Sequence, residues 1–365
     1  MAEIRIENLR KEFGDFTAVR SSSFTIRDGE FFMLLGPSGC GKTTTLRMIA
    51  GLELPTSGEI YIDGEEVSRQ PASRRDIAFV FQMFALYPHM NVRKNISYPL
   101  VSQGMATADV RAKVAEVARI LGIEEILDRP VGGLSAGDRQ RVALGRAIVR
   151  QPKAFMMDEP LGALDAEFRE RMAEELRALH DRMGATTVYV THDQLEAMQM
   201  GDKIVVMNHG VVEQFGEPQD IYDTPKTMFV ADFIGSPPMN FLRFSGSVAP
   251  GDGSVRLSDR SVAVPTLREG ARGDLVLGVR PEHVSLGETG DVPADVVATE
   301  YLGTTQIVTL ATAHGEVKAR IPAATRVPTG ARVGLSLAAS TLSVFDAASG
   351  RALRSDLNAK VFADG

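Results

Sequence analysis

The segment GPSGCGKTT, residues 36–44, combines closely spaced glycines with a lysine and two threonines. Glycines let the backbone curl so that its N–H groups surround a phosphate, while Lys42 can reach the terminal phosphates and the Thr43 hydroxyl can face Mg²⁺. A strand-like run precedes the segment and a helix-like run follows it, as this chemistry requires. The sequence therefore predicts a nucleoside triphosphate site rather than a glycine-rich turn without a ligand. The predicted nucleotide contacts are Gly36, Pro37, Ser38, Gly39, Cys40, Gly41, Lys42, Thr43 and Thr44.

Two adjacent carboxylates end the apolar run AFMMDEP, residues 154–160. At the end of a parallel strand beside a phosphate loop, Asp158 would hold Mg²⁺, directly or through water. Glu159 would then orient and deprotonate the attacking water. Considered alone, the segment could equally be an exposed acidic turn without a metal. Its combination with residues 36–44 favours the hydrolytic interpretation.

Three further side chains become candidates through their surroundings. Gln82, in FVFQMFALYP, follows a strand-like run and could reach both the metal and the water, and His192, in VYVTHD, could touch the terminal phosphate. Phe13, in KEFGDF, could stack on the adenine ring, an interaction worth about 1–3 kcal/mol. In isolation Gln82 would be an ordinary loop residue, His192 a structural histidine and Phe13 a core aromatic. Phe16 is a rival for the base.

The segment LSAGDRQR, residues 134–141, predicts a second helix that begins with small residues. Ser135 would be its N-cap. The free backbone N–H groups and the dipole at such a helix start also attract anions. The residues named above already serve one triphosphate, so we expect this segment to cover the triphosphate bound by another copy of the domain.

The elements that must position these groups alternate along residues 1–235. Short apolar runs alternate with segments whose apolar residues recur at helical spacing, a pattern typical of an α/β domain with a largely parallel core sheet. The expected strands are 30–36, 59–64, 76–81, 153–158, 186–193 and 203–210, and the expected helices are 42–52, 106–123, 136–149 and 165–185.

The pattern changes after FIGSPPMN, residues 233–240. Short β-like segments then recur between turns rich in Gly, Asp and Pro, which predicts a second, all-β domain over 236–365, either a barrel or a sandwich. This region carries equal numbers of acidic and basic residues, so it has no electrostatic footprint for nucleic acid. The expected strands are 241–248, 254–259, 261–265, 275–280, 306–313, 316–322 and 335–346.

Length and composition fit a soluble protein of two domains. The chain has 365 residues, 44% of them hydrophobic and 24% charged, and a net charge of -7 that argues against general nucleic-acid binding. The single cysteine excludes a disulfide within the chain and fits a reducing cytoplasm. The start lacks a signal-peptide pattern, and the apolar runs are shorter than the ~20 residues of a membrane span. We therefore expect any membrane role to depend on a partner.

In combination and in order, these motifs resemble the ATP-binding subunit of ABC transporters over nearly all of residues 1–235. The resemblance identifies GPSGCGKT as the phosphate loop, Gln82 as the Q-loop, LSAGD as the signature and His192 as the switch histidine. FMMDE corresponds to the Walker B strand and LGALD, which contains Asp165, to the D-loop. It implies an ATPase of α/β fold, a P-loop NTPase cassette whose helical subdomain spans roughly 88–150.

The resemblance also implies how ATP and Mg²⁺ are bound. In this family two domains pair head to tail, and each ATP lies between one phosphate loop and the other subunit's signature. Ser135, Gly137 and Asp165 would then contact the ATP of a second ATPase subunit, identical or homologous. The expected metal contacts are Thr43, Gln82 and Asp158.

Three segments extend the resemblance to carbohydrate importers of the maltose and glycerol-phosphate type: 84–100, 235–242 and 278–284. This implies that residues 236–365 form an OB-like regulatory barrel. Two integral-membrane permease subunits would dock near Ala85–His89, and an extracytoplasmic solute-binding protein would act indirectly. The expected activity is ATP hydrolysis coupled to uptake of a sugar, polyol or glycerophosphate-type solute, at the cytoplasmic face of the membrane and without nucleic acid.

Two alternative functions stay open, and two motifs depart from the usual sequence of the family. The chain could serve an exporter, or it could be a soluble ABC-type ATPase acting on nucleic acid or ribosomes. In the signature, Ala136 replaces a glycine and Asp138 a glutamine; we expect the Asp138 side chain to face away from the phosphate, and pairing with a different ATPase chain is the other interpretation. In the D-loop, Gly162 and Ala163 stand where Ser and Asn are common.

Overall fold

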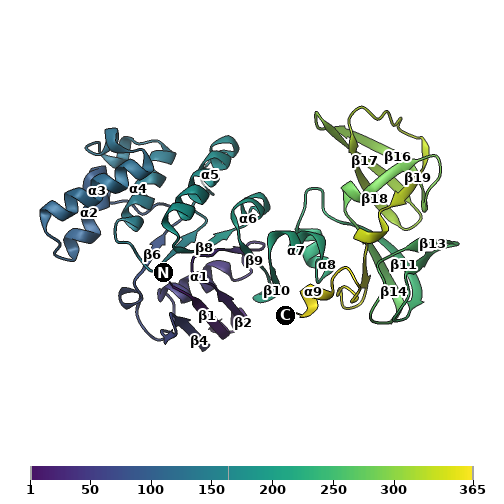
Figure 1. Ribbon diagram of the computed structural model, residues 1–365, viewed down its shortest axis with the longest axis horizontal. Coiled ribbons are helices and arrows are strands. Elements are labelled where there is room, and N and C mark those ends of the chain that lie inside the picture. Colours follow the sequence, from purple (N-terminus) through teal and green to yellow (C-terminus); the bar gives the residue numbers. More distant parts are fainter. Residues whose placement is uncertain (1, 163, 364–365) are drawn as a thin grey trace. The chain divides into compact units, whose positions relative to one another are not determined.

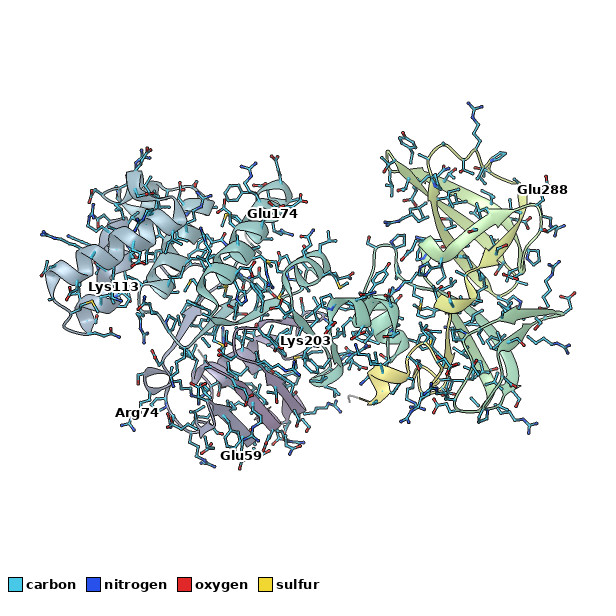
Figure 2. All side chains as sticks on the ribbon, in the orientation of Figure 1. Glu59, Arg74, Lys113, Glu174, Lys203 and Glu288 are labelled. Atoms are coloured by element: carbon cyan, nitrogen blue, oxygen red, sulfur yellow. The ribbon has the colours of Figure 1, made fainter. Side chains whose placement is uncertain are left out.

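The computed structural model describes residues 2–162 and 164–363, and the chain divides into two compact units, Met1–Pro218 and Gln219–Gly365 (Figure 1). Ala163 of the D-loop therefore lies outside the described residues. Charged side chains such as Glu59, Arg74 and Glu174 are exposed on the surface (Figure 2). None of the helices described is long and apolar enough to cross a membrane.

The first unit is built on a ten-stranded sheet of order β5-β4-β1-β2-β10-β9-β3-β8-β7-β6. Its strands are β1 (Ile4–Phe13), β2 (Phe16–Ile26), β3 (Phe31–Leu35), β4 (Ser57–Ile62), β5 (Glu65–Glu66), β6 (Ile77–Val80), β7 (Ala154–Asp158), β8 (Thr186–Thr191), β9 (Lys203–Asn208) and β10 (Val211–Gly216). All six expected strands are present. The five from β9 to β6 pair in parallel, as expected for buried apolar runs.

Strands β1, β2, β4 and β5 form an antiparallel part that the sequence analysis did not anticipate in full. It had expected β4 but neither β1 nor β2. In β1 the apolar residues alternate with charged ones, so Ile4 and Ile6 are buried while Arg5 and Glu7 are only partly covered. This is the pattern of a strand with one face on the core, and it is weaker in sequence than a continuous apolar run.

The parallel register brings the ends of four strands to one edge of the sheet. Leu35 at the end of β3 pairs with Thr191 at the end of β8, Asp158 at the end of β7 pairs with Val190, and Val80 at the end of β6 pairs with Met157. The segments that follow these strands carry the phosphate loop, Glu159, His192 and Gln82. Ligands bind at this edge of open parallel sheets.

The helices of the first unit are α1 (Lys42–Ala50), α2 (Val92–Ser102), α3 (Thr107–Leu121), α4 (Ala136–Ile148), α5 (Ala166–Met183) and α6 (Gln194–Met200). The four expected helices are present, and α2 and α6 are additional. Helices α2, α3 and α4 pack on one another (Figure 1), and Arg141 of α4 forms an ion pair with Glu175 of α5. They lie within the segment expected to form a helical subdomain.

In the second unit the described residues, up to 363, form ten strands in three sheets: β11-β14-β20, β12-β13 and β15-β19-β16-β17-β18. One apolar cluster takes buried side chains from all ten strands, so the sheets share a core. The strands are β11 (Asn240–Val248), β12 (Ser254–Leu257), β13 (Arg260–Ala263), β14 (Ala271–Val279), β15 (Val284–Gly287), β16 (Val292–Tyr301), β17 (Thr305–Thr312), β18 (Gly315–Pro322), β19 (Arg332–Leu337) and β20 (Ser343–Asp346). The expected strand 335–346 is divided between β19 and β20, and β15 and β16 are additional.

The second unit begins 17 residues earlier than the expected boundary at 235/236, because the division falls between Pro218 and Gln219. Helices α7 (Pro218–Asp223) and α8 (Met228–Phe233) lead into it, and α9 (Ala359–Ala363) ends it. Ala231 of α8 packs with Val276 and Phe345. The fully buried Arg280 donates hydrogen bonds to the carbonyl oxygens of Tyr222, Ala231 and Ile234. These contacts attach α7 and α8 to the strands.

Candidate active site

The phosphate loop, residues 36–41, joins β3 to α1, and its backbone requires glycine at more than one position, Gly41 among them. Gly41 has φ 106°, and a Cβ there would lie 2.6 Å from the carbonyl oxygen of Ala18. The buried Lys42 donates from Nζ to the carbonyl oxygens of Gly36 at 2.7 Å and Pro37 at 3.0 Å. The ammonium group is therefore held within the loop. Ser38 and Gly39 are exposed, and Thr43 and Thr44 lie in the first turn of α1.

A hydroxyl and a carboxylate meet beside this loop. Thr43 Oγ1 donates to Asp158 Oδ1 at 2.8 Å. Burial raises the pKa of Asp158, and the hydrogen bond from Thr43 acts in the opposite direction. The Thr43 hydroxyl and the Asp158 carboxylate are both hard oxygen ligands of the kind that Mg²⁺ prefers. No group of three or more His, Cys, Asp or Glu among the described residues could hold a metal, so an ion here would need water or phosphate oxygens as further ligands.

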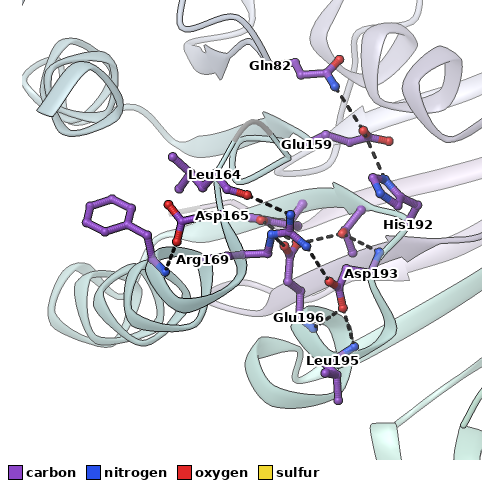
Figure 3. A network of polar contacts seen from close by, with 12 residues as sticks. Gln82, Glu159, Leu164, Asp165, Arg169, His192, Asp193, Leu195 and Glu196 are labelled. Carbon is purple, nitrogen blue, oxygen red and sulfur yellow. Dashed lines mark hydrogen bonds and ion pairs between the residues drawn. The ribbon is translucent and has the colours of Figure 1, made fainter. Parts of the chain in front are cut away.

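Glu159 lies between Gln82 and His192 at the same sheet edge (Figure 3). Its Oε2 accepts a hydrogen bond from Gln82 Nε2 at 3.3 Å and lies 3.3 Å from His192 Nδ1. Glu159 has φ 46°, a left-handed conformation that costs roughly 1–3 kcal/mol in a non-glycine residue. Such strain is common where a side chain must be aimed at a reaction. The tertiary structure thus brings together three residues from separate strand ends.

Phe13 and Phe16 flank the turn between β1 and β2, and neither belongs to the core. Phe13 is 47% exposed and Phe16 is 62% exposed. The alternative that Phe13 is a core aromatic is therefore wrong. Lys11 Nζ lies 4.6 Å from the centre of the Phe13 ring, so a cation already packs against one aromatic face. Phe13 remains available to stack on a base.

The signature segment begins α4 with Ser135 as the N-cap. Ser135 Oγ accepts from Asp138 N at 3.1 Å and donates to Asp138 Oδ2 at 2.8 Å. The serine hydroxyl thus bonds both the backbone and the carboxylate of Asp138 at the helix start. The expectation that the Asp138 side chain faces away from a bound phosphate stays a prediction. Ala136 does not have positive φ, so its methyl group causes no backbone strain.

Gly137 and Asp165 each lie next to Phe168 of α5. A Cβ on Gly137 would lie 2.3 Å from the Phe168 ring, and Asp165 Oδ1 caps α5 by accepting from Phe168 N at 3.0 Å. Among the described residues, no hydrogen bond or ion pair connects Ser135 or Gly137 to the sheet edge of the same chain, whereas the carbonyl oxygen of Asp165 accepts from Arg169 N at 2.9 Å. All three residues lie at helix starts.

A polar network that the sequence did not predict lies next to His192 (Figure 3). Arg169 donates to the carbonyl oxygen of Leu164 at 3.0 Å and to Asp193 Oδ2 at 3.1 Å. The buried Glu196 accepts from Thr191 Oγ1 at 2.7 Å, and burial raises the pKa of its carboxyl. The spacing of Asp193 and Glu196 is that of a capping box, so this sequence signal could have indicated the start of α6.

Cys40 offers a chemical probe of the loop, because it is buried and burial raises its pKa. The thiolate is the reactive form. We expect a maleimide to label Cys40 more slowly than a free thiol at neutral pH and faster as the pH rises. Alkylation should abolish ATPase activity, and ATP should slow the labelling. Mass spectrometry measures the rate of labelling. Equal rates with and without ATP would contradict the placement of phosphates against this loop.

Three family descriptions match the sequence. Residues 19–162 match "ABC transporter", residues 235–284 match "MalK OB fold domain", and residues 277–345 match "TOBE domain". The last two fall within the strand-rich second unit. The cassette fold followed by a strand-rich domain is therefore confirmed.

Several relatives match along most of their length. The trehalose/maltose import ATP-binding protein MalK of Thermococcus litoralis is 46% identical over 374 residues, covering 97% of this chain and 100% of the relative. The sn-glycerol-3-phosphate import ATP-binding protein UgpC of Ruegeria sp. is 44% identical, covering 96% and 99%. A solved dimeric ATP-binding cassette, in a post-hydrolysis state with ADP and Pi, has a TM-score of 0.53 and 32% identity and covers 59% of this chain and 98% of that one.

Proposed function

We propose a working cycle for this chain from the premise that it belongs to the ABC transporter family, as the ATP-hydrolysing subunit of an importer of the sugar and glycerol-phosphate type. The imported solute is a sugar, polyol or glycerophosphate. Relatives named for trehalose, maltose, lactose and sn-glycerol-3-phosphate import support this class. The same relatives do not favour an exporter or an ATPase that acts on nucleic acid or ribosomes.

The proposal for the chemistry rests on one observation, that Gln82 and His192 both contact the carboxylate of Glu159. Lys42 and the loop N–H groups bind the phosphates of ATP. Thr43, Asp158 and Gln82 would hold Mg²⁺, which would neutralise phosphate charge. Glu159 accepts the proton of the attacking water, and His192 contacts the terminal phosphate. Most of the catalysis is positioning and charge stabilisation.

A second ATPase subunit completes the site in this proposal. Ser135 and Gly137 at the start of α4 present N–H groups to the ATP of the partner, and Asp165 contacts the same nucleotide. The similarity to a solved dimeric cassette supports such pairing. Ser135 and Gly137 have no described hydrogen bond or ion pair to the sheet edge of their own chain, which is consistent with such pairing. ATP drives closure because it binds the closed pair more tightly than the open one.

A permease would dock on the segment Ala85–His89, at the cytoplasmic face of the membrane. Phe84 and Ala85 have positive φ, and Arg146 holds their carbonyl oxygens at 3.0 and 2.7 Å. The fully buried Asn95 accepts from Tyr87 N at 2.8 Å and donates to Tyr87 O at 3.2 Å. A backbone fixed in this way can present a defined surface to two membrane subunits. Ala85 comes three residues after Gln82, so the docking segment and a residue of the nucleotide site are close in sequence.

The second unit would act as the regulatory domain, and an extracytoplasmic solute-binding protein would act through the permease. Neither role requires nucleic acid. The matches to the MalK OB fold and TOBE domains support the regulatory assignment.

Lys42→Ala tests the nucleotide assignment directly. Each charge-assisted contact to phosphate is worth about 1.5–3 kcal/mol, so we expect the Kd for ATP to rise by at least about tenfold. Titration of labelled ATP measures this, and circular dichroism checks the fold. Lys113→Ala, an unrelated lysine on α3, is the matched control. Unchanged ATP affinity in Lys42→Ala would contradict the assignment of residues 36–44.

A further inference from the structure

One guanidinium group joins the segments that follow β7 and β8 (Figure 3). Arg169 donates from Nη2 to the carbonyl oxygen of Leu164 at 3.0 Å and from Nη1 to Asp193 Oδ2 at 3.1 Å. Leu164 directly precedes Asp165, and Asp193 directly follows His192. Arg169 therefore connects the D-loop to the switch histidine through two bonds of one rigid, planar group.

The backbone on both sides of His192 is fixed by this network. Asp193 N donates to Thr191 Oγ1 at 2.9 Å, and Asp193 Oδ1 accepts from Leu195 N at 2.8 Å. Thr191 Oγ1 in turn donates to the buried carboxylate of Glu196 at 2.7 Å. The imidazole itself is 55% exposed, and Glu159 is its described polar partner. The position of the ring thus depends on the anchoring of its neighbours.

A small movement would add another hydrogen bond to this network, between Arg169 and Glu196. Arg169 Nε is buried without a hydrogen-bond partner in the described part of the chain, and Glu196 Oε1 lies 3.8 Å from it. A hydrogen bond needs about 2.7–3.2 Å, so a shift of roughly 1 Å would form one. Because Glu196 also binds Thr191 and Tyr189, such a shift would be transmitted to β8, the strand that directly precedes His192.

We propose that Arg169 is a positioning residue for ATP hydrolysis, which couples the D-loop at Leu164–Asp165 to the placement of His192 against Glu159. This inference rests on the proposed function. When the partner subunit approaches Asp165, the guanidinium carries the displacement of Leu164 to Asp193 and Glu196. Closure of the dimer is thereby linked to the geometry of the reacting groups. Arg169 itself does not touch ATP.

Arg169→Lys tests the coupling while keeping the charge. An ammonium group cannot form the same two directed bonds to Leu164 and Asp193. We expect the Kd for ATP to stay within about twofold and kcat to fall by roughly 10²-fold, as for a small misplacement of reacting groups. Arg171→Lys is the matched control, because Arg171 lies two residues away on α5 in an exposed pair with Glu167. It should leave kcat unchanged.

A double variant shows whether Arg169 acts through His192. If it does, Arg169→Lys combined with His192→Ala should hydrolyse ATP no more slowly than His192→Ala alone. Multiplied losses in the double variant, or a normal kcat in Arg169→Lys, would overturn the inference. Asp193→Asn, which keeps the cap oxygen but weakens the pair with Arg169, should lower kcat without changing ATP affinity. Asp193→Asn provides the test if Arg169→Lys does not fold. A normal kcat in Asp193→Asn would likewise overturn the inference.

The wild-type chain separates this inference from the proposed function. If wild-type protein does not hydrolyse ATP, even with a second ATPase chain and the permease, the proposed function fails. If it does hydrolyse ATP and Arg169→Lys and Asp193→Asn match it, only the coupling fails.

Discussion

Glu159→Gln should lower the rate of ATP hydrolysis by about 10²–10⁴-fold, the usual weight of a general base. Glutamine keeps the shape of the side chain and can still meet Gln82 and His192, both of which contact Glu159 at 3.3 Å. It cannot accept the proton of the attacking water. ATP binding should persist, because Lys42 and the loop N–H groups are unchanged. The variant should therefore accumulate as an ATP-bound dimer, which size-exclusion chromatography with ATP measures.

The control for this experiment is Glu174→Gln, an exposed carboxylate on α5 in the same unit. It should retain wild-type turnover and show no ATP-dependent dimer beyond that of the wild type. Near-normal phosphate release by purified Glu159→Gln would show that another group activates the water. In that case the strained backbone of Glu159 would require a different explanation.

Ser135→Arg should abolish hydrolysis while each chain still binds ATP. A long cationic side chain at the start of α4 would occupy the position of the partner's phosphates, so the two domains could not close. The change also removes the cap and the bond to Asp138, at a cost of about 1 kcal/mol. Ser102→Arg, on the exposed end of α2, controls for the added charge. Phosphate release and ATP affinity are measured for both.

Mixing Ser135→Arg with Lys42→Ala gives the sharper result. In a mixed dimer one composite site combines the intact loop of the first chain with the intact signature of the second. Hydrolysis should reappear in the mixture although each variant alone is inactive, provided that one site can fire by itself. Full activity of Ser135→Arg alone would contradict the proposal that residues 134–138 act on a partner's ATP. Inactive wild-type protein that gains activity from a second ATPase chain would instead indicate a heterodimer.

The sequence predicted the core strands β3, β7 and β8, which are buried along their whole length, and the helices α1, α3, α4 and α5. These elements carry strong periodic signals, and their order determined the α/β class. It did not predict β1 and β2, in which exposed residues interrupt the buried ones, or the helices α2 and α6. It also set the boundary of the second unit at 235/236 rather than 218/219. The reason is that Arg280 attaches α7 and α8 to strands far away in sequence.

At the site, too, some features follow from the sequence alone and others depend on the tertiary structure. The motif at 36–44 determines its own chemistry, because glycine at 41 and lysine at 42 act within one loop and need only the strand and helix beside them. The approach of Gln82 and His192 to Glu159 depends on the register of parallel strands distant in sequence, and no local pattern encodes such distances. The capping of Asp138 onto Ser135 and the bridge made by Arg169 are likewise tertiary or conformational facts. Short-range spacing thus determined which residues can do chemistry, and only the packing of the sheet and helices decided which of them meet.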